Sequence, residues 1–149
     1  MSYPFEKFHH LCIVVRDIEE KIKYFESIGL GPWTEYPPLT EYSEVEAPNM
    51  DGFMELRYVQ AVVGDVEIQL VQPGEHDSPQ KQFIEKYGEG VYHMGFVVDD
   101  VNKGEQVLKE KGLKILSRGR RPDQSGFDYF DTKNEAGVNL LIRKTATHK

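Results

Sequence analysis

The sequence has little cysteine and no long apolar run, and each shortage excludes a class of protein. Its 149 residues include one cysteine, Cys12, so no intrachain disulfide can form, and we expect a reducing compartment, the cytoplasm. No segment approaches the roughly 20 apolar residues that a membrane-spanning helix needs. The chain also lacks an opening basic segment followed by an apolar one, so we expect neither a membrane anchor nor a signal peptide.

Positive charge is scarce relative to negative charge. The chain has 18 Lys and Arg residues against 25 Asp and Glu residues, which gives a formal net charge of −7. This balance disfavours nucleic acid and anionic membranes as partners. A hydrophobic content of 39% over this length is enough for one compact unit, or for two half-size modules that share a core.

The most informative feature of the sequence is a short segment that occurs twice. The segment HLCIVVRDI that begins at His10 recurs as HMGFVVDDV at His93, at an offset of 83 residues. Side chains alternate between the two faces of a strand, so His10 and His93 are predicted to open two strands and to face the same side of a sheet. The same alternation directs His9 to the opposite side, where we expect a structural role.

A shorter repeat closes each half of the chain. The segment GDVEIQLV at 64–71 resembles AGVNLLIR at 136–143, at an offset of 72 residues. Gln69 is the counterpart of Leu141 in this alignment. Glu67 and Gln69 share the face opposite to the apolar side chains of their strand.

Hydrophobic periodicity and turn residues predict the remaining elements. Helices are predicted between Asp17 and Gly29, from Pro79 to Gly88 and over about 100–111. Strands are predicted over 8–16, 33–36, 53–63, 65–72, 113–118, 127–132 and 137–143, with one more that begins near 91. The segment from Arg118 to Pro122 is predicted to be a connecting loop.

Two modules, each ordered strand, helix, strand, strand, strand and each opened by a histidine, resemble the vicinal oxygen chelate family. The resemblance is carried by HLCIVVRDIE, VEIQLVQP and GEGVYHMGFVVDDV. It implies an α+β fold in which two βαβββ modules form a curved mixed sheet around one cavity. The first module is expected over 8–73, a linker with a short helix over 74–90, and the second module over 91–144, together forming one domain.

The resemblance also implies a divalent metal held at four strand positions, three of which fall on His10, Gln69 and His93. Gln69 makes the chain most similar to methylmalonyl-CoA epimerase, since glyoxalase I usually has a glutamate there. The fourth position falls on Leu141, which cannot ligate a metal, and no Asp or Glu lies between 136 and 149. Neutral donors alone would hold Co, Ni, Mn, Mg or Zn more weakly, so a protein without metal stays an open alternative.

The function that the resemblance implies is a metal-assisted isomerase, such as an epimerase, or a lyase. The substrate would be an enolisable acyl compound such as a CoA thioester, and the reaction would pass through a stabilised enolate. Glu55 is the candidate base, and Asp128 is a second acid that could replace the missing carboxylate.

The candidate substrate-pocket residues are Leu141, Tyr129, Arg120 and Arg121. The arginines either bind a phosphate or carboxylate of the substrate or lie in a solvated loop. Leu141 also suits a metal-free protein that binds or sequesters a small organic molecule, and a glyoxalase I-like lyase is the third alternative. In each case the partner is a small molecule, and the family implies a homodimer.

Overall fold

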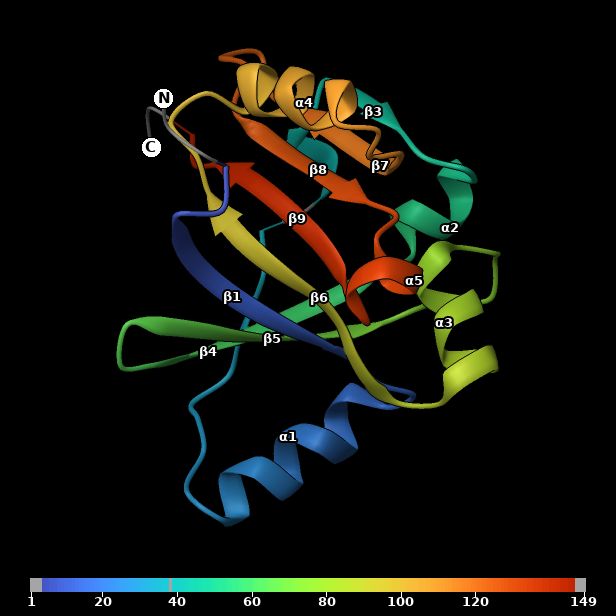
Figure 1. Ribbon diagram of the computed structural model, residues 1–149. Helices are drawn as coiled ribbons and strands as arrows, with labels where there is room; N and C mark the ends of the chain where they lie inside the picture. Colours follow the sequence, from blue (N-terminus) through green and yellow to red (C-terminus); the bar gives the residue numbers. More distant parts are fainter. Residues whose placement is uncertain (1–3, 38, 147–149) are drawn as a thin grey trace.

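The computed structural model describes residues 4–37 and 39–146, and its strands form one sheet flanked by helices (Figure 1). The strands are β1 (Lys7–Val14), β2 (Thr34–Glu35), β3 (Glu44–Glu46), β4 (Arg57–Val63), β5 (Val66–Gln72), β6 (Gly90–Val97), β7 (Ile115–Arg120), β8 (Gly126–Phe130) and β9 (Asn139–Lys144). The helices are α1 (Ile18–Ser27), the 3-10 helix η1 (Leu39–Glu41), α2 (Met50–Met54), α3 (Pro79–Tyr87), α4 (Val101–Glu110) and α5 (Lys133–Ala136). None of these described helices has the length and apolarity needed to cross a bilayer.

The strands pair in the order β2-β4-β5-β1-β6-β9-β8-β7-β3 within the described part of the chain. β1 and β6, the two histidine strands, lie antiparallel at the centre of the sheet. Each of them pairs in parallel with the last strand of its own half, β1 with β5 and β6 with β9. The architecture is therefore a mixed α+β fold with a single curved sheet that does not close, which confirms the predicted fold class.

The two halves begin in the same way after their histidine strands. Asp17 and Asp100, which are 83 residues apart, both have extended backbones and both cap the helix that follows. Asp17 accepts a hydrogen bond from the backbone N–H of Glu20 at 3.2 Å, and Asp100 accepts one from that of Lys103 at 3.1 Å. These bonds satisfy backbone donors that the first helical turn leaves unpaired.

Apolar clusters cover both faces of the sheet. On the outer face, α1 packs Ile18 against Leu70 of β5, and α4 packs Leu108 against Phe130 and Ile142. These two helices lie at opposite ends of the molecule in Figure 1. The inner face carries the largest cluster, in which side chains of both halves meet: Cys12, Val14, Val71, Tyr92, Phe127, Tyr129 and Leu141. This inner face holds the candidate site.

Two predicted segments differ from the structure. The predicted strand over 53–63 begins only at Arg57, because Asn49 accepts a hydrogen bond from the N–H of Gly52 at 3.0 Å and caps α2. The predicted loop from Arg118 to Pro122 is wrong for its first three residues, since β7 continues to Arg120. The reason is a partner from the other half of the chain: β3 pairs with β7 and extends the sheet at that edge.

Candidate active-site cavity

A β-bulge brings three histidines together. The register of β1 against β6 shifts between Phe8 and His10, and this shift turns the side chain of His9 toward that of His10. The Nδ1 atoms of His9 and His10 are 2.8 Å apart, and the Nε2 atoms of His10 and His93 are 2.9 Å apart. The convergence of His10 with His93 is as expected. The expectation that His9 faces away is wrong, because strict alternation ends at the bulge.

Gly95 makes room for the His10 ring. Gly95 lies opposite His10 in the β1–β6 ladder, and a Cβ atom at this position would collide with the imidazole of His10. The absence of a side chain on β6 therefore lets the ring lie flat against the neighbouring strand and reach His93. Any larger residue at this position would displace the His10 ring.

Burial keeps the histidine rings neutral. His93 is fully buried, and burial lowers its pKa to about 3. Burial and the neighbouring His93 lower the pKa of His10 well below its usual value. Burial, together with the positive charge of Arg143, also lowers the pKa of His9. Near pH 7 the three rings can therefore act as lone-pair donors or as neutral hydrogen-bond partners.

A cavity of about 70 Å³ lies beside His10 and Gln69, which is room for a few non-hydrogen atoms. Much of its wall is aromatic or aliphatic: Tyr36, Phe53, Tyr58, Phe127, Tyr129 and Leu141. An outer groove of about 700 Å³ shares Tyr36, Glu41, Arg121 and Arg143 with this cavity. A ligand could thus place a small group in the cavity and a longer part in the groove.

Two tyrosines of the cavity wall form a hydrogen-bonded pair. The hydroxyl oxygens of Tyr58 and Tyr129 are 2.7 Å apart, and the side-chain amide of Gln80 donates to the Tyr58 hydroxyl at 3.3 Å. Burial raises the pKa of both hydroxyls, so both stay protonated. The pair has two O–H protons and uses one between its members, which leaves the other available to a ligand.

Glu67 is the carboxylate nearest to the histidine cluster among the described residues. It accepts a hydrogen bond from the Gln69 amide at 2.6 Å and one from the Tyr36 hydroxyl at 3.4 Å. Arg143 in turn donates to the Tyr36 hydroxyl at 2.8 Å. Burial raises the pKa of Tyr36 to about 12, so this hydroxyl can relay the contact between Arg143 and Glu67 as a neutral group.

The four positions at which the resemblance places a metal do not form a complete donor set. Leu141 borders the cavity but offers no ligand atom. His93 is fully buried and its Nε2 faces His10 rather than the cavity wall. The Gln69 nitrogen donates to Glu67 and Tyr36, so this side chain has only its neutral amide oxygen left for an ion. These positions therefore lack an anionic ligand and do not fit a resident divalent ion by themselves.

Glu55, the candidate base, lies away from the cavity. It ends α2 rather than occupying a strand, and its carboxylate accepts a hydrogen bond from the backbone N–H of His76 at 2.8 Å. The ring of His76 lies 2.9 Å from the same oxygen. This placement gives Glu55 a structural partner on the exterior and removes the geometric basis for its role as a base.

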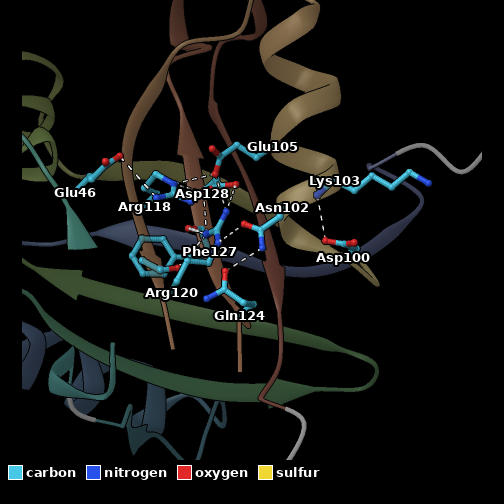
Figure 2. Close-up of polar contacts among 11 residues, drawn as sticks. Glu46, Asp100, Asn102, Lys103, Glu105, Arg118, Arg120, Gln124, Phe127 and Asp128 are labelled. Carbon is cyan, nitrogen blue, oxygen red and sulfur yellow. Dashed lines mark hydrogen bonds and ion pairs between the residues drawn. The ribbon is translucent and has the colours of Figure 1, made fainter. Parts of the chain in front are cut away.

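Asp128 and Arg120 belong to an ion-pair cluster on the outer face, under α4 (Figure 2). Arg120 is fully buried, and its Nη atoms lie 3.0 Å from Asp128 and 2.6 Å from Glu105. Burial raises the pKa of Asp128 to about 7 against the opposing charge of Arg120. Neither side chain borders the cavity or the groove, so neither is placed to bind a ligand there. Of the other predicted pocket residues, Tyr129, Leu141 and Arg121 do border the cavity.

Five residues that the site uses were not predicted: His9, Glu41, Tyr58, Glu67 and Arg143. Two of them carried a signal, because Glu67 and Arg143 each lie two positions from a predicted site residue on the same strand face, next to Gln69 and Leu141 respectively. Glu41 ends the 3-10 helix η1 between β2 and β3, and His9 depends on the bulge, so strand alternation could not find either.

The chain matches the family model described as Glyoxalase/Bleomycin resistance protein/Dioxygenase superfamily over residues 9–130. Among curated proteins, the uncharacterized protein YqjC of Bacillus subtilis is 26% identical over 117 residues, which cover 78% of this chain and 75% of that protein. Human mitochondrial methylmalonyl-CoA epimerase is also 26% identical, over 112 residues that cover 74% of this chain. The match spans 57% of the human protein, little more than half of its length.

Solved structures share the fold. Methylmalonyl-CoA epimerase from Mycobacterium tuberculosis has a TM-score of 0.70 and 21% sequence identity, and the match covers 98% of this chain and 92% of that chain. A variant of Streptomyces coelicolor methylmalonyl-CoA epimerase in complex with 2-nitronate-propionyl-CoA has a TM-score of 0.70 and 20% identity, with coverage of 96% and 99%. At this level of identity the similarity shows a common fold and leaves the reaction to be argued from the site.

Proposed function

Since the chain belongs to the glyoxalase/bleomycin resistance protein/dioxygenase superfamily, we propose that it is an isomerase, of the epimerase type, for an enolisable acyl compound that carries a negative charge. A CoA thioester such as methylmalonyl-CoA is the substrate class we infer. The observation that carries the proposal is the hydrogen-bonded pair of Tyr58 and Tyr129 hydroxyls in the wall of a cavity that Arg143 also borders.

The tyrosine pair supplies what an enolate needs. Removal of a proton next to a carbonyl places negative charge on the carbonyl oxygen, and a fixed O–H donor in a dry site stabilises that charge. The hydroxyl of Tyr129 or Tyr58 can donate to this oxygen without first breaking the bond between the two rings. Both rings are held by packing on the inner face, so the donor is positioned before the substrate arrives.

Arg143 supplies the recognition of negative charge. Its guanidinium borders both the cavity and the groove, and no carboxylate of the described residues lies within ion-pair distance of it. A substrate carboxylate could form two charge-assisted hydrogen bonds with this side chain. The outer groove has the size to receive a longer part of the ligand, such as the pantetheine arm of a CoA ester.

Glu41 is the carboxylate that we assign to proton transfer. It borders both the cavity and the groove, and Arg121 holds it at 3.2 Å. Glu41 would take the α-proton from one face, water from the outer groove would return a proton to the other face, and the resulting hydroxide would take the proton from Glu41. The side chains of this chain bind and orient the ligand and remove its proton in this scheme.

The test follows the proton next to the thioester carbonyl. Purified protein is incubated with one epimer of methylmalonyl-CoA in deuterium oxide, and proton nuclear magnetic resonance follows loss of the α-proton signal. We expect exchange well above the rate without protein, and we expect Glu41→Gln to remove most of it. Exchange no faster than the protein-free rate, with methylmalonyl-CoA and with other 2-substituted acyl-CoA esters, would refute the proposal.

A metal-free binding protein is the second candidate, and Leu141 is the observation that favours it. An aliphatic side chain stands where a carboxylate would complete the metal set, and it adds apolar wall next to Phe127 and Tyr129. Under this alternative the protein would bind an acyl-CoA ester, detected by calorimetry, without accelerating exchange of its α-proton.

A further inference from the structure

The histidine bulge and the first-half strand β5 place three metal-ligating side chains around one point. One ligand atom each of His9, His10 and Glu67 lies within 4.8 Å of the other two. The Nδ1 atoms of His9 and His10 are 2.8 Å apart. Two histidine nitrogens bound to one ion at about 2.0–2.1 Å lie about 3 Å apart when they are adjacent ligands. The spacing of the two imidazoles therefore suits a shared ion.

We propose that His9, His10 and Glu67 form a divalent-metal site. Glu67 of β5 supplies the carboxylate ligand that the family resemblance places on β9, where this chain has Leu141. Two imidazoles and one carboxylate leave three positions of an octahedron, or one of a tetrahedron, for water or a ligand. This set suits Zn²⁺, Co²⁺, Ni²⁺, Mn²⁺ or Fe²⁺. The site goes beyond the proposed function and does not depend on it.

Neighbouring side chains hold two of the proposed ligands, His10 and Glu67, in place through hydrogen bonds. His10 turns its Nε2 to His93 at 2.9 Å, which leaves Nδ1 on the side of His9. Glu67 is held by the Gln69 amide at 2.6 Å. Metal ligands in proteins usually have such partners, which fix the ring tautomer and the direction of the carboxylate. His93 and Gln69, which the family resemblance makes ligands, are positioning residues in this arrangement.

The site can be reached from solvent. His9 and Glu67 border the outer groove, and His10 borders the inner cavity, so the ion would lie where the two spaces meet. Arg143 opposes cation binding through its charge, since it contacts Tyr36 at 2.8 Å and Tyr36 contacts Glu67. A carboxylate bound to Arg143 would cancel this repulsion.

The first experiment measures metal binding directly. Protein stripped with chelator is titrated with Co²⁺, and the absorption bands of the bound ion give stoichiometry and affinity. We expect one ion per chain, and at least tenfold weaker binding in Glu67→Gln and in His9→Gln. His76→Gln, which alters an exposed histidine outside the site, should bind like the wild type. Circular dichroism verifies that each variant is folded.

The second experiment counts nitrogen ligands by electron paramagnetic resonance of bound Cu²⁺, in the His76→Gln background. The proposed site gives two imidazole nitrogens, and His9→Gln reduces them to one while His93→Gln keeps two. An ion held between His10 and His93 gives the reverse pattern. The proposal is overturned if the wild type binds no Co²⁺, if Glu67→Gln and His9→Gln bind as the wild type does, or if His93→Gln alone removes a nitrogen. None of these readouts needs enzymatic activity, so a failure here is separate from a failure of the proposed reaction.

Discussion

Two arginines of the second half lie on opposite faces of the same sheet, and their surroundings differ. Arg120, under α4, is fully buried between the carboxylates of Asp128 and Glu105. Arg143, on the side of the cavity, contacts the Tyr36 hydroxyl at 2.8 Å and the Thr145 hydroxyl at 3.5 Å. Among the described residues it has no carboxylate within ion-pair distance.

The difference separates charge that holds the fold from charge that is left for a ligand. A buried guanidinium must be paired inside the protein, since an uncompensated charge in the interior is costly. A guanidinium at the border of a cavity can keep its charge unpaired because solvent or a ligand reaches it. We therefore expect substitutions on the outer face to change stability and those on the inner face to change binding and activity.

The largest expected effect is on the outer face. Asp128→Asn keeps the shape of the side chain but leaves Arg120 with Glu105 as its remaining carboxylate partner. Breaking a buried ion pair costs about 3–5 kcal/mol of the free energy of unfolding. Urea denaturation at pH 8 measures the loss, at a pH where Asp128, with its pKa of about 7, is ionised in the wild type.

A double variant sharpens this prediction. Arg120→Met combined with Asp128→Leu removes both charges, and apolar replacement of a whole buried pair is often neutral or stabilising. We expect the double variant to recover a large part of the stability that Asp128→Asn loses. The prediction is wrong if the double variant loses as much free energy of unfolding as the Arg120→Met and Asp128→Leu single variants together, because the two side chains would then act independently.

In contrast to the outer-face variants, a substitution in the tyrosine pair is expected to lower activity and to change stability little. Tyr129→Phe removes one hydroxyl from the inner face and leaves the ring packing intact. Loss of one donor to a developing oxyanion lowers kcat by about 100-fold to 1000-fold in comparable sites. The α-proton exchange assay measures this effect, and the free energy of unfolding should change by about 1 kcal/mol. A stable variant with unchanged exchange would remove the tyrosine pair from the mechanism.

Arg143 and Arg121 form the next comparison, both on the cavity side. Arg121 is paired with Glu41 at 3.2 Å and lies over the ring of Tyr42, whereas Arg143 has no such pair. Loss of a charge-assisted hydrogen bond costs about 1.5–3 kcal/mol, so Arg143→Gln should weaken binding of an acyl-CoA carboxylate by about 10-fold to 100-fold. Calorimetry checks this loss, and we expect a smaller one for Arg121→Gln. Equal losses would mean that pairing within the protein does not decide which arginine binds the ligand.

The repeat explains why much of the fold could be predicted. The two histidine strands, the helices capped by Asp17 and Asp100 and the convergence of His10 with His93 all follow from local periodicity at a constant offset. The alignment of Leu141 with Gln69 likewise depends on a short repeat, and Leu141 borders the cavity without offering a ligand atom. Such features depend on short segments that carry their own signal.

The unpredicted features depend on contacts between distant segments. The bulge that turns His9 comes from the pairing of β1 with β6, and β7 extends to Arg120 because β3 of the other half pairs with it. The placement of Glu55 depends on a cap at Asn49 and on a contact with His76. Alternation along one strand contains none of this information.

The smallest expected effect concerns a polar group of the inner face that is buried without full pairing. His93 Nδ1 has no hydrogen-bond partner among the described residues, and burial lowers the pKa of this ring to about 3. An unfolded chain takes up this proton near pH 6.5, so the unfolded state binds more protons between about pH 6.5 and 3. The contribution of His93 to stability is therefore complete above pH 6.5 and is lost as the pH falls, by about 1.4 kcal/mol per pH unit.

His93→Gln should remove this dependence on pH, and the slope of stability against pH reveals it even if the variant is less stable overall. Metal-free wild type and variant are unfolded with urea at several pH values between 6 and 5. Over this range the free energy of unfolding of the wild type should fall by about 1.4 kcal/mol more than that of the variant. His76→Gln is the matched control, because Glu55 raises the pKa of His76 and stability from that pair is lost as the pH rises. That loss begins only above about pH 6.5, so His76→Gln should leave the slope between pH 6 and pH 5 as in the wild type, whereas His93→Gln should make it less steep. Equal slopes in wild type and His93→Gln would mean that His93 is protonated as readily in the folded protein as in the unfolded chain, which its burial against the His10 ring does not allow.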